Sequence, residues 1–215
     1  QIPHPYLERA HPGVTIDSPE SYSFCDVSNS NTQKGHVHYQ AGMYIRNRLI
    51  ASDTIRPMTC TKIYGGERNS IWSGDHRDGV ERFWRNLFCG MAALRFHRPP
   101  SGIGLYEMAK KHIQSVRLLE NKFDFFTCQP DETIFAEKSA QQIYAIRNES
   151  GAVAVCFVRG GKASLELPES LDRPYTVRWL NPANAFWQKE TKIATLQIEL
   201  EAPNSGLWIS LITPE

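Results

Sequence analysis

The chain has 215 residues, of which 41% are hydrophobic and 22% charged, enough apolar material for one large or two small globular domains. Its formal net charge of +1, from 24 Lys and Arg against 23 Asp and Glu, does not supply the basic surface that nucleic-acid binding requires. No apolar run approaches the roughly 20 residues of a membrane-spanning helix. We therefore expect neither a nucleic acid nor a membrane as a partner.

The five cysteines are scattered singly, and no two are spaced as a CxxC pair. An odd number of isolated cysteines predicts free thiols rather than a disulfide framework, a zinc site or a redox dithiol. They are Cys25, Cys60, Cys89, Cys128 and Cys156. Free thiols are typical of a reducing compartment, and no signal peptide is visible after Gln1, so the sequence favours a cytoplasmic location without fixing the compartment.

In the first 131 residues, short apolar runs alternate with segments of helical periodicity. The predicted strands cover residues 22–27, 56–64 and 91–97, and the predicted helices lie near residues 39–50, 80–88 and 105–120. This alternating order is typical of a parallel sheet whose strands are joined by helical crossovers. The strands are apolar on both faces, as expected of strands buried on both sides.

The helix near residues 80–88 has the clearest pattern in the chain. Its apolar residues recur at i, i+3, i+4, i+7 and i+8, namely Val80, Phe83, Trp84, Leu87 and Phe88. Asp78, with Glu81 three residues later, resembles a capping box, so we expect Asp78 to cap the helix. Gly90 is expected to end it.

After residue 132 the apolar pattern changes to period two, which indicates strands. Seven segments have this pattern, at residues 142–147, 153–158, 163–167, 175–180, 185–189, 196–200 and 207–211. Gly160-Gly161 lies between two of them and predicts a two-residue hairpin. Short antiparallel strands of this kind favour a β-sandwich over residues 132–215, after an α/β domain over residues 1–131, with the boundary near Asp131.

The predicted fold is therefore a partial (β/α) barrel of about three βα units, followed by an antiparallel β-sandwich. Three βα units are too few to close a barrel, which needs roughly eight strands. Three alternatives are consistent with this shortage of strands: the first domain borrows strands from another chain, its sheet is open, or the chain is the tail of a longer protein. Exposed edges of a three-stranded parallel sheet are unfavourable, so we expect a homodimer or an upstream barrel segment as partner.

Five segments carry a resemblance to a known family: residues 56–57, 62–66, 79–86, 95–100 and 177–182. They read RP, KIYGG, GVERFWRN, RFHRPP and VRWLNP, in that order. The chain is similar to the C-terminal part of bacterial TIM-barrel glycoside hydrolases, in which the sixth to eighth βα units precede a β-sandwich sometimes labelled collagen-binding-like. The resemblance implies hydrolysis of a glycosidic bond in a carbohydrate substrate, and no cofactor is expected.

Function in a parallel βα sheet lies on the loops that follow the strands. After the first strand, Asp26, Asn29 and Asn31 have side chains that suit sugar hydroxyls but equally suit turns and helix caps. His38 is a further candidate for a sugar contact. His36 and His38 alternate as metal ligands on a strand can, but spacing ties no carboxylate or third histidine to them, so no metal site is expected.

After the second strand, the candidate site residues are Lys62, Tyr64, Glu67 and Trp72. Retaining glycosidases use two carboxyl groups about 5–5.5 Å apart, one as nucleophile and one as acid/base. Glu67 is the candidate nucleophile, and the alternative is a solvated loop residue. The resemblance places the nucleophile at the end of this strand, but Lys62 stands at that position. It places the acid/base at the end of the fourth strand of the barrel, which is not among these three strands. Tyr64 and Trp72 can stack on a sugar ring.

The third strand places Arg95 and His97 on one face and Leu94 and Phe96 on the other. Arg95 and His97 are candidates for hydrogen bonds to a substrate at the mouth of the barrel. The alternative for Arg95 is an ion pair with a neighbouring acid. The sequence thus predicts a carbohydrate-active protein and leaves open whether it is a glycoside hydrolase or a non-catalytic carbohydrate-binding or assembly module.

Overall fold

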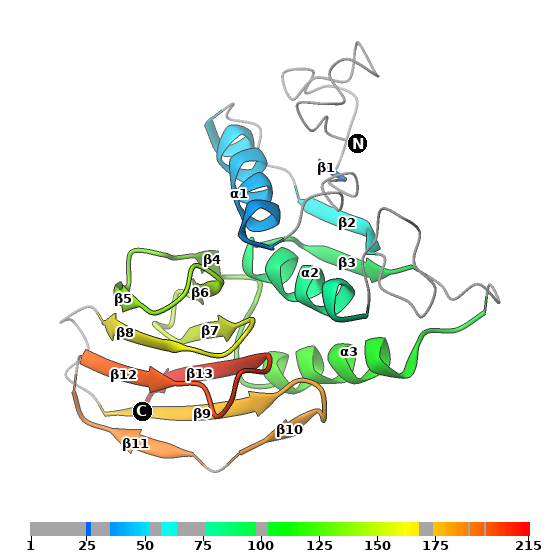
Figure 1. Ribbon diagram of the computed structural model, residues 1–215. Helices are drawn as coiled ribbons and strands as arrows, with labels where there is room; N and C mark the ends of the chain where they lie inside the picture. Colours follow the sequence, from blue (N-terminus) through cyan, green and yellow to red (C-terminus); the bar gives the residue numbers. More distant parts are fainter. Residues whose placement is uncertain are drawn as a thin grey trace. The chain divides into compact units, whose positions relative to one another are not determined.

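The computed structural model describes residues 25–26, 35–51, 57–63, 76–97, 103–167, 174–188, 190–195 and 197–215. The chain divides into two compact units, Gln1–Tyr106 and Glu107–Glu215. The described residues form three helices, one parallel sheet and two antiparallel sheets, a mixed α/β fold (Figure 1). This division groups the third predicted helix with the strands that follow it, and the domain boundary near Asp131 stays a prediction.

The first unit contains a three-stranded parallel sheet with two helical crossovers, the order that the sequence predicted. Its strands are β1 (Cys25–Asp26), β2 (Met58–Ile63) and β3 (Ala93–Phe96), paired in the order β1-β2-β3. The crossovers are α1 (Gly35–Ala51) and α2 (His76–Phe88).

The predicted apolar stripe of α2 packs against this sheet. Phe83 stacks on Phe96 of β3 with ring centroids 4.7 Å apart, and Trp84 and Phe88 are fully buried. Burial of each such side chain contributes roughly 1.5–3 kcal/mol. Gly90 ends the helix as predicted: its φ is 78°, and its N–H donates a 3.0 Å hydrogen bond to a carbonyl of the last turn.

The predicted capping box at the start of α2 is wrong. The helix begins at His76, so Asp78 lies inside the first turn rather than ahead of it. Its negative charge is still favourable there, because the amino end of a helix carries a partial positive charge. The Glu81 carboxylate binds Arg77 and Arg85.

α1 begins at Gly35, before the start predicted near residue 39. His36 and His38 therefore lie on a helix and do not alternate along a strand. The helix approaches α2 closely at Gly42, where a Cβ atom would lie 2.8 Å from the Sγ atom of Cys89. A glycine at this position lets the two helices pack at short range.

The second unit consists of α3 (Glu107–Glu120) followed by antiparallel strands. The strands are β4 (Gln129–Pro130), β5 (Phe135–Lys138), β6 (Ile143–Arg147), β7 (Val153–Phe157), β8 (Lys162–Glu166), β9 (Tyr175–Asn181), β10 (Phe186–Trp187), β11 (Thr191–Ile193), β12 (Gln197–Glu201) and β13 (Trp208–Pro214). The larger sheet has the order β10-β9-β13-β7-β6-β4, with β11 also paired to β9, and the smaller sheet has the order β12-β8-β5.

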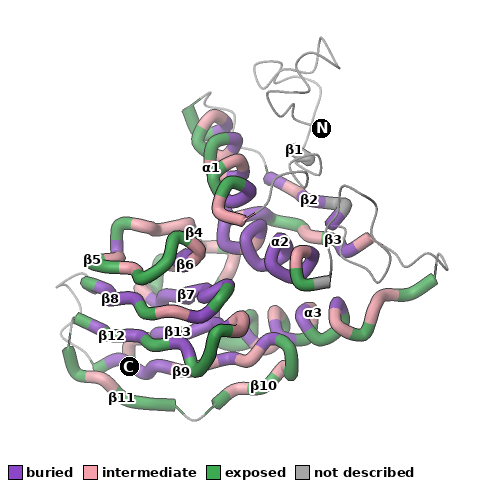
Figure 2. Tube along the Cα trace, in the orientation of Figure 1, coloured by how far each residue is buried: buried purple, intermediate pink, exposed green. Residues whose placement is uncertain are grey.

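One hydrophobic core joins the two sheets of the second unit. It includes Phe157 and Trp208 from the larger sheet and Leu165 and Ile198 from the smaller one, all at most 4% exposed. Strand β7 is buried along its whole length, β13 is buried at its first five residues, and β9 is buried at four of its seven residues (Figure 2). The opposite face of the larger sheet is also apolar, and α3 packs beside β9, where Ser115 Oγ donates a 2.9 Å hydrogen bond to the carbonyl of residue 182.

The hairpin predicted at Gly160-Gly161 is wrong. β7 and β8 belong to different sheets, so this segment carries the chain from the larger sheet to the smaller one. Both glycines have positive φ, 66° and 112°. A Cβ atom at Gly160 would lie 2.4 Å from the backbone oxygen of Asn204, so the crossing requires a residue without a side chain.

The cysteines that the structure describes at side-chain level are free, as predicted. Cys60, Cys89 and Cys156 are buried, and Cys128 is half-buried. Among the described helices, none combines the length and the hydropathy needed to cross a membrane. Within the described ranges, no three His, Cys, Asp or Glu side chains gather in a way that could hold a metal ion.

Candidate functional site

The carboxyl ends of β2 and β3 lie side by side in the first unit. Ile63 pairs with Phe96, and the backbone N–H of His97 donates a 2.8 Å hydrogen bond to the carbonyl of Ile63. His97 is therefore the first residue after β3, and its backbone is bonded to the last residue of β2. The backbone thus brings three predicted site positions, Lys62, Arg95 and His97, to the same end of the sheet.

Asp26 lies at a different level of the sheet. It pairs with Thr59, which in turn pairs with Ala93 near the amino end of β3. Thr59 precedes Ile63 by four residues, which corresponds to roughly 13 Å along a regular strand and somewhat less here because of a bulge. The described part of β1 therefore does not bring Asp26 alongside His97.

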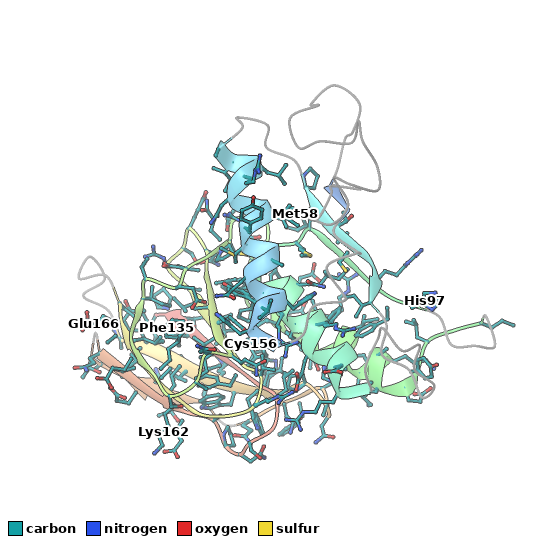
Figure 3. The ribbon with its side chains drawn as sticks, turned by 45° about the horizontal axis from the view of Figure 1, so that its top comes forward. Met58, His97, Phe135, Cys156, Lys162 and Glu166 are labelled. Atoms are coloured by element: carbon teal, nitrogen blue, oxygen red, sulfur yellow. The ribbon has the colours of Figure 1, made fainter. Side chains whose placement is uncertain are left out.

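Strand alternation puts Arg95 and His97 on the side of the sheet away from α2. The neighbouring residue Phe96 points to α2, where it stacks on Phe83, and the alternation along a strand turns Arg95 and His97 the other way. Arg95 is exposed and His97 is half-buried. Figure 3 shows His97 just beyond the end of β3, whereas Met58 marks the start of β2. Both side chains can donate hydrogen bonds to hydroxyl or carboxylate oxygens.

Several predicted site residues lie outside the described residues. They are Asn29, Asn31, Tyr64, Glu67 and Trp72. For Asp26 and Lys62 the structure describes the backbone and not the side chain. The proposed roles of all seven stay predictions.

His38 differs from the other candidates because it is buried. The side chain is 1% exposed in the first turns of α1, and both ring nitrogens lack a hydrogen-bond partner. Burial, and then the positive charges of Arg85 and Arg82, lower the pKa of His38 from 6.5 to about 3. The imidazole is therefore neutral at physiological pH, and its role as a sugar contact stays a prediction.

Arg85, whose charge acts on His38, belongs to a buried polar cluster on α2 that the sequence analysis missed. The Glu81 carboxylate pairs with Arg85 at 2.6 Å and with Arg77 at 2.9 Å, and the side chains of Glu81 and Arg85 are 2% and 1% exposed. Asn86 is also buried, and neither atom of its amide has a partner. A pattern in the sequence could have predicted these ion pairs, because residues of opposite charge follow one another at intervals of four on one helix face: Arg77, Glu81 and Arg85.

No protein-family model and no curated protein matches the sequence. Solved structures do match. A glycoside hydrolase of family 5 from Bacteroides vulgatus ATCC 8482 superposes with a TM-score of 0.68 and 10% identity, over 92% of this chain and 51% of that one. Another structure described as a glycoside hydrolase gives a TM-score of 0.65 and 10% identity, over 83% of this chain and 47% of that one.

The fold is glycoside-hydrolase-like. A glucosidase from Croceicoccus marinus matches more loosely, with a TM-score of 0.50 and 11% identity over 98% of this chain and 56% of that one. At this level of identity the likeness shows a shared fold. The chain spans about half the length of the solved structures that it matches.

Proposed function

We propose that this chain is the C-terminal portion of a glycoside hydrolase, with a partial (β/α) barrel and an accessory β-sandwich. The likeness to two glycoside hydrolases at TM-scores of 0.65 and 0.68 carries the proposal. The parallel sheet of the first unit supplies the last strands of the barrel. The sandwich in the second unit is structural, since nothing in its sequence specifies a collagen ligand.

The proposed reaction is hydrolysis of a glycosidic bond at the carboxyl ends of β1 to β3. Glu67, in the segment after β2, is the proposed nucleophile, and a second carboxyl group about 5–5.5 Å away would act as acid and base. That second group would come from another part of the barrel. Arg95 and His97 would donate hydrogen bonds to the substrate, and Tyr64 and Trp72 would stack on a sugar ring.

The exposed face of the sheet in the first unit also supports the proposal that a partner segment packs on it. Ala93 and Arg95, on its face away from the helices, are exposed. Parallel sheets normally have both faces covered, so a further βα segment or a second copy of the chain would complete the barrel. The substrate would lie on this face once the barrel is complete.

The second candidate function is a non-catalytic carbohydrate-binding or assembly module. Lys62 favours it, because the resemblance expects a glutamate nucleophile where this lysine stands. In that case Arg95, His97 and the aromatic residues would hold a sugar without cleaving it.

A panel of aryl glycosides tests the two functions on the complete product of the reading frame. Hydrolysis that falls about 10³-fold or more in Glu67→Gln, and not in the exposed control Glu149→Gln, supports the enzyme with Glu67 as nucleophile. Oligosaccharide binding by calorimetry without hydrolysis supports the binding module. If the panel shows no hydrolysis and no binding, both proposals are overturned.

A further inference from the structure

An aromatic row runs from the core of the second unit onto its surface. Phe157 and Trp208 are buried, and Trp179 is half-buried and contacts both, with ring centroids 5.3 and 6.5 Å away. Phe186 pairs with Asn181 where β10 follows β9 at the edge of the larger sheet (Figure 1). Trp179 precedes Asn181 by two residues, so it shares a face with Phe186, at diagonal positions about 7–8 Å apart. Phe186 is 62% exposed, and the row therefore continues past the core into solvent.

The turn that leads into Phe186 has a strained backbone. Ala185, directly before it, has a φ of 51°, in the left-handed region that an alanine seldom adopts. Asn181 Oδ1 accepts hydrogen bonds from the backbone N–H groups two and three residues later, at 3.1 and 3.3 Å. On the other side of the turn, Ser115 Oγ of α3 donates a 2.9 Å hydrogen bond to the carbonyl of residue 182. Strain of this kind persists only where the surrounding structure holds it, and such positions cluster at functional sites. The turn therefore fixes the place of Phe186.

Amide side chains border the aromatic row. The backbone N–H of Gln188 donates a 2.7 Å hydrogen bond to the carbonyl of Trp179, which places the exposed Gln188 opposite Trp179 on the same face. Asn204 is also exposed, and its Oδ1 accepts hydrogen bonds from Trp208 Nε1 at 3.0 Å and from the Gly206 N–H at 2.8 Å. These two bonds hold the Asn204 amide beside the row and turn its NH2 group, which is a donor, away from the indole.

This combination of groups matches the chemistry of a neutral sugar. One face of a pyranose ring consists of C–H groups that stack on an aromatic ring, and its edge carries hydroxyls that bond to amides. An acidic sugar would call for Arg or Lys, whereas Gln188 and Asn204 carry no charge. Because Trp179 packs on two other rings and Phe186 follows a fixed turn, binding would cost little side-chain entropy. Two aromatic residues in a row suit a chain of sugar units rather than a single one.

We propose that the surface formed by Trp179, Phe186, Gln188 and Asn204, which we call the hairpin face, binds a segment of a neutral polysaccharide. This inference rests on the proposed function for its class of ligand, and it adds a second carbohydrate site to the one proposed at the carboxyl ends of the parallel strands. The sandwich then holds the polymer in addition to its structural role.

Affinity electrophoresis tests the hairpin face on the complete product of the reading frame. Separate native gels contain xylan, mixed-linkage β-glucan, galactomannan or, as an anionic polymer, polygalacturonate. Phe186→Ala removes the exposed ring, and Gln188→Ala removes the amide beside the row. Phe126→Ala is the matched control, because Phe126 is a 95% exposed phenylalanine of the same unit in the segment after α3. Urea midpoints verify that each variant is folded.

The proposal expects at least one neutral polysaccharide to retard the wild-type protein. Phe186→Ala should raise the dissociation constant about tenfold or more, Gln188→Ala about threefold or more, and Phe126→Ala less than about twofold. Equal retardation of Phe186→Ala and the wild type would overturn the proposal, and so would retardation by polygalacturonate alone or by no polymer. A dimer that Phe186→Ala dissociates, without retardation in any gel, would also overturn it, since a second copy would then cover the hairpin face.

Hydrolysis of aryl glycosides of single sugars is measured on the same proteins. Such a substrate does not extend beyond one site, so Phe186→Ala should hydrolyse it at the wild-type rate. Retardation that depends on Phe186, without hydrolysis, leaves the inference standing while the proposed activity fails. Hydrolysis with retardation that does not depend on Phe186 gives the reverse result, so the two failures are distinguishable.

Discussion

Glu81 and Arg85 form a buried ion pair one helical turn apart, with 2.6 Å between Oε2 and Nη2 and with side chains 2% and 1% exposed. Two buried charges are tolerated only while each keeps its partner, because a buried charge without a partner destabilises the folded state strongly. The pair lies beside His38, whose ordinary charge would add to that of Arg85. The polar cluster between α1 and α2 is therefore sensitive to any change in charge.

Glu81→Gln should destabilise the first unit by about 3–5 kcal/mol, because it leaves Arg85 buried without its carboxylate. The double variant Glu81→Leu with Arg85→Met should recover most of this loss, since apolar residues of similar size fill the same space. Urea unfolding measures both. Glu107→Gln, which breaks an exposed pair with Lys110, is the control and should leave the urea midpoint unchanged. A Glu81→Gln midpoint equal to the wild-type value would contradict this prediction.

The stability of the protein should fall as the pH drops from about 6.5 toward 3. Burial first, and then Arg85 and Arg82, lower the pKa of His38 in the folded chain to about 3, while its ordinary value is 6.5. Between these values the unfolded chain binds a proton at His38 and the folded chain does not, so acid favours unfolding. The loss should reach up to about 1.4 kcal/mol per pH unit and is read from urea midpoints at a series of pH values.

His38→Gln should remove that part of the pH dependence, whereas His36→Gln, two residues earlier on the same helix, should retain it. Burial also lowers the pKa of His112 on α3 to about 4, so a smaller dependence should remain in His38→Gln. An unchanged pH profile in His38→Gln would show that this imidazole is not buried as described.

Features set by local spacing were predictable from the sequence. The apolar row of α2 and the glycine that ends it depend on neighbours within a few residues, and so do the alternating strands of the second unit. Three strands were missed, β4, β5 and β11, because they have two to four residues and form only beside a partner. The Gly160-Gly161 segment was assigned to a hairpin because two glycines specify a turn but not which strand pairs across it.

The candidate site was predictable to the same extent. The alternation along β3 predicted that Phe96 faces away from Arg95 and His97, and Phe96 stacks on Phe83 of α2, whereas the roles of Arg95 and His97 stay predictions. The register between β1 and β2 depends on pairing between distant segments, so the level of Asp26 in the sheet could not be predicted from local sequence. Likewise, the spacing of Asp78 and Glu81 suits a capping box, whereas in the fold Glu81 is a buried ion-pair partner of Arg85, and burial depends on tertiary packing.

Gly160→Ala should destabilise the second unit by about 2 kcal/mol or more. The left-handed backbone, with φ of 66°, costs an alanine about 1–2 kcal/mol, and the added Cβ would lie 2.4 Å from the backbone oxygen of Asn204. Gly104→Ala is a matched control: its φ is 74°, but nothing lies within 4 Å of the added carbon, so only the backbone cost remains. Thermal unfolding compares the two, and equal losses would show that the sheet crossing has room for a side chain.

Arg95→Met should weaken carbohydrate binding at least tenfold while changing stability by less than about 0.5 kcal/mol, because the side chain is exposed on the sheet face away from the helices. Arg95 and His97 lie two residues apart on one face, so His97→Phe should weaken binding in the same way. Arg117→Met on α3 removes an exposed arginine elsewhere and should leave binding unchanged. Calorimetric titration with oligosaccharides measures the affinity, and urea unfolding measures the stability. If Arg95→Met lost stability and kept its affinity, the arginine would serve the sheet, and the sugar site would lie elsewhere.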